Sequence, residues 1–144
     1  MSATDAEKHR ILETVKTLAV VGLSSRLSRA GYYVPAYMQQ AGYRIIPVNP
    51  HLEQALGEKA YPDLLAVPEP VDLVLIFRRS EEVPPVVEQA IEIGAQVVWM
   101  QVGVVNELAA AKARAAGLAV VMDACIMVDH RRLMASGQAS FTRR

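Results

Sequence analysis

Five short, largely apolar runs recur along this chain, and they set its predicted architecture. Leu18 to Val21 is the clearest of them, because it is apolar throughout, with no polar alternation. Uninterrupted runs of this kind are typical of strands that are buried on both faces, as in a parallel sheet. The runs predicted as strands span residues 18–21, 43–48, 71–77, 97–101 and 118–122.

Segments with helical spacing separate these runs. Val34, Met38 and Ala41, for example, fall on one face of a helix. Thr4 and Glu7 have the spacing of a capping box at the start of the first helix. Helices are expected within residues 1–16, from about residue 5, and at 31–40, 81–93, 107–116 and 125–136, with a short edge strand at 58–61, a helical turn at 62–65 and a loose tail at 137–144.

The expected helix ends carry suitable residues. Ser80 and Asn106 are the predicted N-caps of the helices that follow them, and Gly42, Gly94 and Gly117 are suitable C-caps. Strands that alternate with helices in this way predict a single α/β domain over residues 1–144. We expect a doubly wound parallel sheet, Rossmann-like, in three α/β/α layers.

Composition narrows the class of partner. The chain has 144 residues, 52% of them hydrophobic and 21% charged, which is enough for one globular domain with a core. A formal net charge of +0 argues against nucleic acid. We expect no membrane partner and a cytoplasmic location, because no apolar run is long enough to span a bilayer, no secretory signal opens the chain and Cys125 is the lone cysteine. Apolar helix faces are compatible with a homodimer, so the oligomeric state stays undecided at this point.

The stretch from Leu18 to Tyr37 reads as strand, glycine turn and helix, which is how a nucleotide-binding βαβ unit opens. A diphosphate binds at the start of such a helix, where N–H groups are free. The dinucleotide fingerprint is incomplete, because only Gly22 of its glycines is present, and the second strand ends at residues 47–50 without an acidic residue. The loop therefore indicates phosphate binding, while the ribose carboxylate of an NAD site is missing.

Ligands of such sheets bind at the carboxyl ends of the strands. The residues expected there include four arginines, and arginine recognises phosphate by paired hydrogen bonds. Coenzyme A carries a diphosphate and a ribose 3′-phosphate, so it requires cations where NAD requires a carboxylate. The predicted CoA-binding residues are Gly22, Leu23, Ser24, Ser25, Arg26, Arg29, Val48, Asn49, Pro50, Phe77, Arg78, Arg79, Gln101 and Gly103.

Several stretches, in order along nearly the whole chain, resemble the small CoA-binding-domain family, whose members are similar to the N-terminal domain of the succinyl-CoA synthetase α chain. The resemblance implies a Rossmann-type domain that binds CoA at the strand ends, with the 22–24 turn at the phosphates. It does not extend to ligase activity, because no histidine here matches the synthetase's phosphate carrier. The stretches span residues 19–24, 42–50, 57–62, 71–74, 77–79, 99–104 and 121–125.

We therefore expect a protein that binds CoA or an acyl-CoA without catalysis of its own. One alternative is a CoA-dependent enzyme that uses Cys125, with His130 as its only nearby histidine. Others are an NAD(H)-binding redox sensor and an interaction domain that binds no nucleotide. No metal set is expected. Asp123 is expected to cap the last helix, with the orientation of another group as the alternative, and one of Tyr32, Tyr33 and Tyr37 is expected to cover the ligand.

Overall fold

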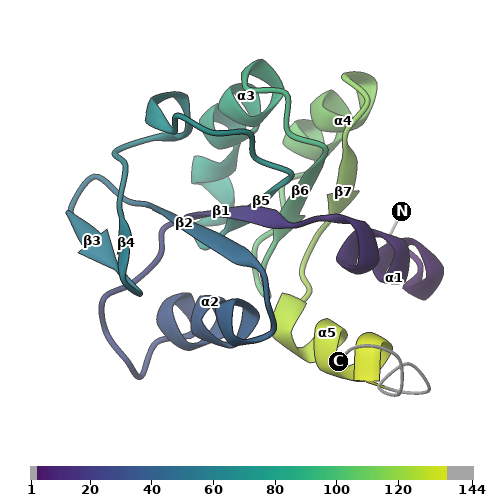
Figure 1. Cartoon of the computed structure of the whole chain (residues 1–144). Coiled ribbons are helices and arrows are strands. Elements are labelled where there is room, and N and C mark those ends of the chain that lie inside the picture. The colour runs from purple at the N-terminus through teal and green to yellow at the C-terminus, as the bar shows by residue number, and fades with distance from the viewer. Residues whose placement is uncertain (1–2, 136–144) are drawn as a thin grey trace.

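In the computed structural model, residues 3–135 are described, and they form a five-stranded parallel sheet flanked by helices (Figure 1). The strand order is β2-β1-β5-β6-β7. The predicted doubly wound sheet is thus confirmed, and all five apolar runs form its strands. Their bounds are Thr17–Val21 (β1), Arg44–Val48 (β2), Leu73–Ile76 (β5), Val97–Met100 (β6) and Ala119–Val121 (β7).

The helices form two layers, one on each face of the sheet (Figure 1). α3 and α4 cover one face, while α1, α2 and α5 cover the other. The three-layer prediction is therefore confirmed, although α1 ends before residue 16 and the predicted tail at 137–144 lies outside the described residues. The helices are Asp5–Thr14 (α1), Ala30–Gln40 (α2), Val83–Glu92 (α3), Glu107–Ala115 (α4) and Ile126–Ala135 (α5).

Successive residues of each central strand enter opposite halves of the core. In β1, Leu18 and Val20 pack toward α1, α2 and α5, while Ala19 and Val21 pack toward α3 and α4. These residues are almost completely buried. Burial on both faces explains why the strands are uninterrupted apolar runs. The strand ends are consequently held in fixed positions by the packing beneath them.

The predicted N-caps Thr4 and Asn106 form, whereas Ser80 does not cap a helix. The capping box of Thr4 and Glu7 is present, and the side chain of Asn106 accepts a hydrogen bond from the N–H of Ala109. Ser80 is different, because residues 80–82 form a 3₁₀ turn and α3 begins at Val83. The Ser80 hydroxyl oxygen accepts a hydrogen bond from the N–H of Val105 at 2.9 Å. The prediction for Ser80 is wrong, since this side chain fastens the loop after β6.

The segment between β2 and β5 also differs from its prediction. The strand predicted at 58–61 forms in part, as β4 (Glu58–Lys59), which pairs with β3 (Gln54–Ala55) in a hairpin that projects beyond the sheet (Figure 1). Tyr61 then makes a single parallel bridge to Val48. The helical turn is a 3₁₀ turn at Leu64–Ala66 (η1), slightly later than expected.

Charged side chains join α1 to α5. Arg132 donates to both carboxylate oxygens of Asp5, at 2.8 and 3.0 Å, and also contacts Asp129. Lys8 lies 3.1 Å from Asp129, whose side chain is 8% exposed. The first and last described helices are therefore held together by ion pairs as well as by apolar packing.

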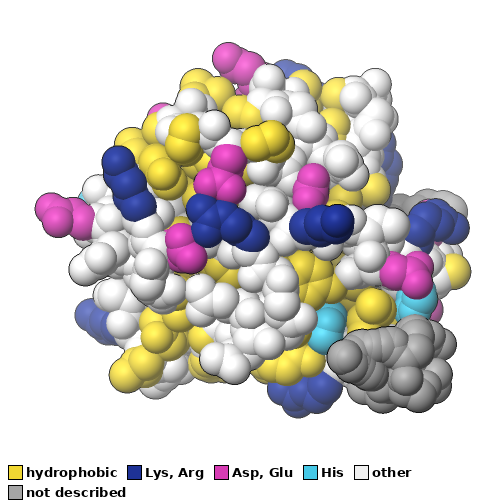
Figure 2. All heavy atoms as spheres, in the orientation of Figure 1, with side chains coloured by type: hydrophobic (Ala, Val, Ile, Leu, Met, Phe, Trp, Pro, Cys, Tyr) yellow, Lys and Arg dark blue, Asp and Glu magenta, His cyan; other side chains and the backbone are white. Residues whose placement is uncertain are grey.

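The surface carries charges of both signs. Figure 2 shows acidic and basic side chains interspersed on one face of the molecule rather than gathered into a patch of one sign. This distribution agrees with the formal net charge of +0. No helix within residues 3–135 has the length and apolar character needed to cross a bilayer.

Candidate functional site

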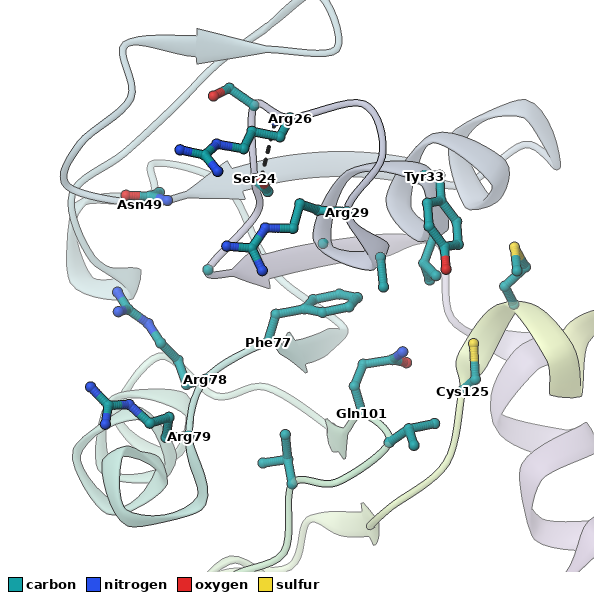
Figure 3. Close-up of a pocket in the computed structure, with 18 of the residues that line it drawn as sticks. Ser24, Arg26, Arg29, Tyr33, Asn49, Phe77, Arg78, Arg79, Gln101 and Cys125 are labelled. Atoms are coloured by element: carbon teal, nitrogen blue, oxygen red, sulfur yellow. Dashed lines mark hydrogen bonds between the residues drawn. The ribbon is translucent and has the colours of Figure 1, made fainter.

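A pocket of about 1090 Å³ opens at the carboxyl ends of β1, β2, β5 and β6 (Figure 3). It lies where the order of strands reverses, because the chain leaves β1 for β2 on one side and later adds β5 on the other. Open α/β sheets bind ligands at this position. Most of the predicted residues line the pocket: Gly22, Ser24, Ser25, Arg26, Arg29, Asn49, Phe77, Arg78, Arg79 and Gln101.

Four predicted residues lie outside the pocket lining. Leu23 is completely buried in the core, and Val48 is 2% exposed. Their backbones still shape the site, because the Val48 carbonyl accepts a hydrogen bond from the N–H of Gly22. Pro50 and Gly103 are exposed residues next to the lining rather than part of it.

The turn after β1 requires glycine. Gly22 has a φ of +88°, and a Cβ atom added to it would lie 2.2 Å from the carbonyl oxygen of Phe77. Gly31, in the first turn of α2, faces the same loop, and its carbonyl accepts a hydrogen bond from the N–H of Ser24 at 3.0 Å. The 22–31 loop is thus folded back onto the start of α2 by backbone contacts, which leave no space for a side chain at Gly22 and little at Gly31.

The start of α2 presents N–H groups to the pocket. Its N-cap, Arg29, makes no side-chain capping hydrogen bond, and both Ala30 and Gly31 line the pocket. The first N–H groups of a helix have no partner within the helix, and this end carries the positive end of the helix dipole. The Ser24 hydroxyl accepts a hydrogen bond from the N–H of Arg26 and so holds the preceding turn. The arrangement is suited to an anionic group such as a diphosphate.

Arginines cluster on one side of the pocket. Figure 3 shows Arg26, Arg29, Arg78 and Arg79 on this side, some projecting over the strand ends. Glu82 is the acidic residue among the lining residues, and its carboxylate lies 4.0 Å from Arg78, at the limit of an ion pair. The pocket lining therefore carries a clear excess of positive charge, although the whole chain is neutral.

Asn49 positions the loop after β2. Its side-chain amide donates to the carbonyl of Leu23 at 2.9 Å, while its side-chain oxygen accepts from the N–H of His51 at 2.8 Å. These two bonds connect the ends of β1 and β2 at the pocket. His51 and Leu52 consequently reach the lining, although the sequence pattern gave no signal for them.

The opposite end of the pocket is formed by β6 and the start of α5. Gln101 is 4% exposed, and its side-chain oxygen accepts a hydrogen bond from the N–H of Ile126 at 2.9 Å. Cys125 directly precedes Ile126 and lines the pocket together with Met127 and Val128. Gln101 therefore anchors the first residue of α5, and α5 supplies a wall that sequence reasoning did not include.

Near this wall Asp123 does not cap α5 as expected, and His130 contacts tyrosines instead of Cys125. Asp123 accepts a hydrogen bond from the N–H of Gly103 at 2.7 Å, so it holds the loop after β6 instead of capping α5. The His130 ring lies 2.8 Å from the Tyr37 hydroxyl and packs edge-on against Tyr37 and Tyr43. This geometry gives no support to a pair of Cys125 with His130.

The described residues 3–135 contain no group of three or more His, Cys, Asp or Glu side chains placed to bind a metal ion.

Tyr33 is the tyrosine of the 32–37 segment that lines the pocket, and it is 46% exposed. The arrangement as a whole can hold an extended ligand with anionic groups at one end and a less polar group at the other.

The model of the CoA binding domain family matches residues 16–131 of this chain. The chain belongs to the CoA binding domain family, and the predicted resemblance is confirmed. The matched region includes the entire sheet and every residue that lines the pocket.

The chain is also similar to individual proteins. An uncharacterized protein, YneT of Bacillus subtilis, is 48% identical over 125 residues, which cover 87% of this chain and 93% of that one. The structure of a hypothetical protein from Pyrococcus horikoshii OT3 superimposes with a TM-score of 0.89 at 39% identity, covering 92% of this chain and 93% of that one. An ADP-forming acetate–CoA ligase II of Archaeoglobus fulgidus is 32% identical over 81 residues, 55% of this chain but 12% of that enzyme.

Proposed function

We propose that this protein binds coenzyme A or an acyl-CoA in the pocket at the strand ends, and that it does so without catalysis of its own. The observation that carries the proposal is the uncapped start of α2 beside four arginines. Membership of the CoA binding domain family supports the same ligand. The reaction of the acetate–CoA ligase is not included in the proposal, because the similarity covers 12% of that enzyme.

In this proposal the diphosphate lies against the Gly22–Ser24 turn and the first N–H groups of α2. Gly22 and Gly31 support the assignment, since each brings backbone close to the place where the phosphates bind. Arg26, Arg29, Arg78 and Arg79 provide cations for the diphosphate and for the ribose 3′-phosphate.

The same features favour CoA over NAD(H). An NAD site of this fold holds the ribose hydroxyls with a carboxylate after the second strand. Here Asn49 follows β2, and both ends of its side-chain amide are engaged by Leu23 and His51. A ligand whose ribose carries a third phosphate in place of a free 3′-hydroxyl fits this positively charged region better.

Titration calorimetry on protein freed of bound ligand tests the proposal. We expect CoA to bind, and dephospho-CoA to bind about tenfold more weakly, because charge-assisted hydrogen bonds to the 3′-phosphate are lost. Arg78→Ala should weaken CoA binding and reduce the difference between the two ligands. Arg10→Ala, which removes an exposed arginine of α1 outside the pocket lining, is the matched control. The absence of CoA binding, or tighter binding of NADH than of CoA, would overturn the proposal.

A further inference from the structure

We propose that the end of the pocket opposite the arginines receives the acyl group of an acyl-CoA, and that the side-chain amide of Gln101 binds the thioester carbonyl oxygen. This inference rests on the proposed function, because it extends the same ligand along the same pocket. It names the preferred form of that ligand: an acyl thioester rather than free CoA.

The two ends of the pocket differ in chemistry. Figure 3 shows Arg78 and Arg79 on one side and Tyr33, Gln101 and Cys125 on the other. The start of α2, where the diphosphate is proposed to bind, lies between these two groups. With the adenosine and its phosphate on the arginine side, the pantetheine arm extends toward Gln101 and brings the sulfur atom to this end.

Apolar side chains at this end are unusually exposed. Val102 is 65% exposed, Val128 is 48% exposed and Tyr33 is 46% exposed, and all three line the pocket. Val102 directly follows Gln101, and Val128 lies in the first turn of α5, which Gln101 anchors. Exposed apolar side chains gathered in a cavity are typical of a surface that a ligand covers. A short acyl chain has the size and polarity to cover them.

Gln101 supplies the polar contact. It is 4% exposed and lines the pocket, and its side-chain oxygen is engaged by the N–H of Ile126. Its side-chain nitrogen donates to no other described residue. Because the oxygen must accept from Ile126, the orientation of the amide is fixed with the N–H groups as the remaining donors. These N–H groups reach the pocket instead of being enclosed in the core, and a thioester carbonyl provides an acceptor for them that the thiol of free CoA lacks.

Affinities for four ligands test this inference: CoA, acetyl-CoA, butyryl-CoA and S-butyl-CoA, a thioether without the carbonyl. Full burial of a methylene is worth about 4-fold in affinity, and half of that free energy, about 2-fold, is expected at an open rim. Butyryl-CoA should therefore bind about 4-fold more tightly than acetyl-CoA. It should bind about 10-fold more tightly than S-butyl-CoA, because the hydrogen bond to the carbonyl is then absent.

Gln101→Glu separates the carbonyl contact from the fold. Glutamate keeps an oxygen for the N–H of Ile126 but has no N–H of its own. Butyryl-CoA and S-butyl-CoA carry the same phosphates, so repulsion between these phosphates and the new carboxylate cancels in the ratio of their affinities. We expect this ratio to fall from about 10 to about 1 in the variant.

A second variant tests the apolar contact. Val102→Ser combined with Val128→Ser should reduce the ratio of butyryl-CoA to acetyl-CoA affinity from about 4 to about 1. Leu108→Ser is the matched control, because Leu108 is 85% exposed on α4 and does not line the pocket. It should leave the ratio unchanged.

The outcomes distinguish this inference from the proposed function. If CoA itself does not bind to the wild-type protein, the proposed function fails and the acyl site fails with it. If CoA binds, but butyryl-CoA binds no more tightly than CoA and no more tightly than S-butyl-CoA, the acyl site alone is overturned. Thermal midpoints of all variants in the absence of ligand identify any that are unfolded, and the ratios in the wild-type protein decide the inference in that case.

Discussion

Gly22 passes so close to Phe77 that a Cβ atom on Gly22 would lie 2.2 Å from the Phe77 carbonyl oxygen. This contact joins the end of β1 to the end of β5, where the pocket opens. Gly22→Ala places a side chain against backbone and also requires a left-handed φ of +88°. We expect the free energy of unfolding to fall by about 3 kcal/mol, as the sum of about 1–2 kcal/mol for the backbone and the remainder for the clash. Urea denaturation measures it.

Gly94→Ala provides the control for that prediction. Gly94 has a similar φ of +77°, but an added Cβ would meet no atom within 4 Å. Its substitution should cost only the backbone contribution, about 1–2 kcal/mol. Equal losses in the two variants would show that the close approach to Phe77 has no energetic effect.

The Tyr43 hydroxyl should make stability depend on alkaline pH. Burial raises the pKa of Tyr43 to about 12, with a smaller contribution from nearby Tyr37, and its hydroxyl donates to the carbonyl of Leu12. Because the pKa in the folded state is higher than that in the unfolded state, the contribution is complete below pH 10 and is lost as the pH rises toward 12. We expect a loss of about 2 kcal/mol over this range.

Urea denaturation of the wild-type protein and of Tyr43→Phe between pH 8 and pH 12 checks this dependence. Phenylalanine lacks the titrating hydroxyl, so the stability advantage of the wild-type protein should shrink through this range. Parallel curves for the two proteins would contradict the prediction.

Asp5 should make stability depend on acidic pH, with a contribution that is lost as the pH falls. The hydrogen bond from Arg132 holds the pKa of Asp5 below its usual range. A carboxylate with a lowered pKa in the folded state stabilises above its unfolded pKa, near 3.8, and this contribution is lost as the pH falls through the folded value. Asp5→Asn should therefore be less stable than the wild-type protein at pH 6, and the difference should disappear toward pH 2.

Thermal midpoints at pH 6, 4 and 2 measure this effect. Glu53→Gln is a useful control, because Glu53 is exposed and forms no ion pair with another residue of the described range 3–135. A difference between wild type and Asp5→Asn that persists at pH 2 would show that the Arg132 contact is not its source.

Cys125 provides a direct report on the occupied pocket. It is the lone cysteine of the chain and lines the pocket at the Gln101 end, so a maleimide labels a single position. Saturating CoA should slow this labelling at least 5-fold if the pantetheine arm extends to this wall, a protection equivalent to about 1 kcal/mol. Adenosine 3′,5′-bisphosphate, which lacks the arm, should not protect. Labelling at the same rate with and without CoA would place the arm elsewhere.

Much of the fold was predictable because its signals are local. Residues 18–21 and 73–76 are buried on both faces, so their apolar character is continuous and identifies them as strands. Gly22 likewise has a local requirement for a positive φ. The rim of the site followed from one topological rule, because the residues after each parallel strand meet at the same edge.

The missed features depend on contacts between distant segments. Ser80 has the sequence context of a helix cap, but its hydroxyl oxygen instead accepts a hydrogen bond from the N–H of Val105. Asp123 similarly binds the N–H of Gly103 across the rim. The wall formed by α5 was missed because the sequence does not show how the last helix packs beside the pocket. Propensity describes what a residue can do locally, whereas the folded chain decides among competing partners.

The position of the pocket has a consequence for how such proteins diversify. The side chains that line the pocket belong mostly to loops beyond the strand ends, whereas residues such as Leu18, Leu73 and Val98 form the hydrophobic core. Apart from the glycine turn, recognition and folding therefore use largely separate residues. Substitutions at the rim can alter which ligand is accepted while the buried framework stays intact, so one scaffold can acquire a range of specificities by small and independent changes.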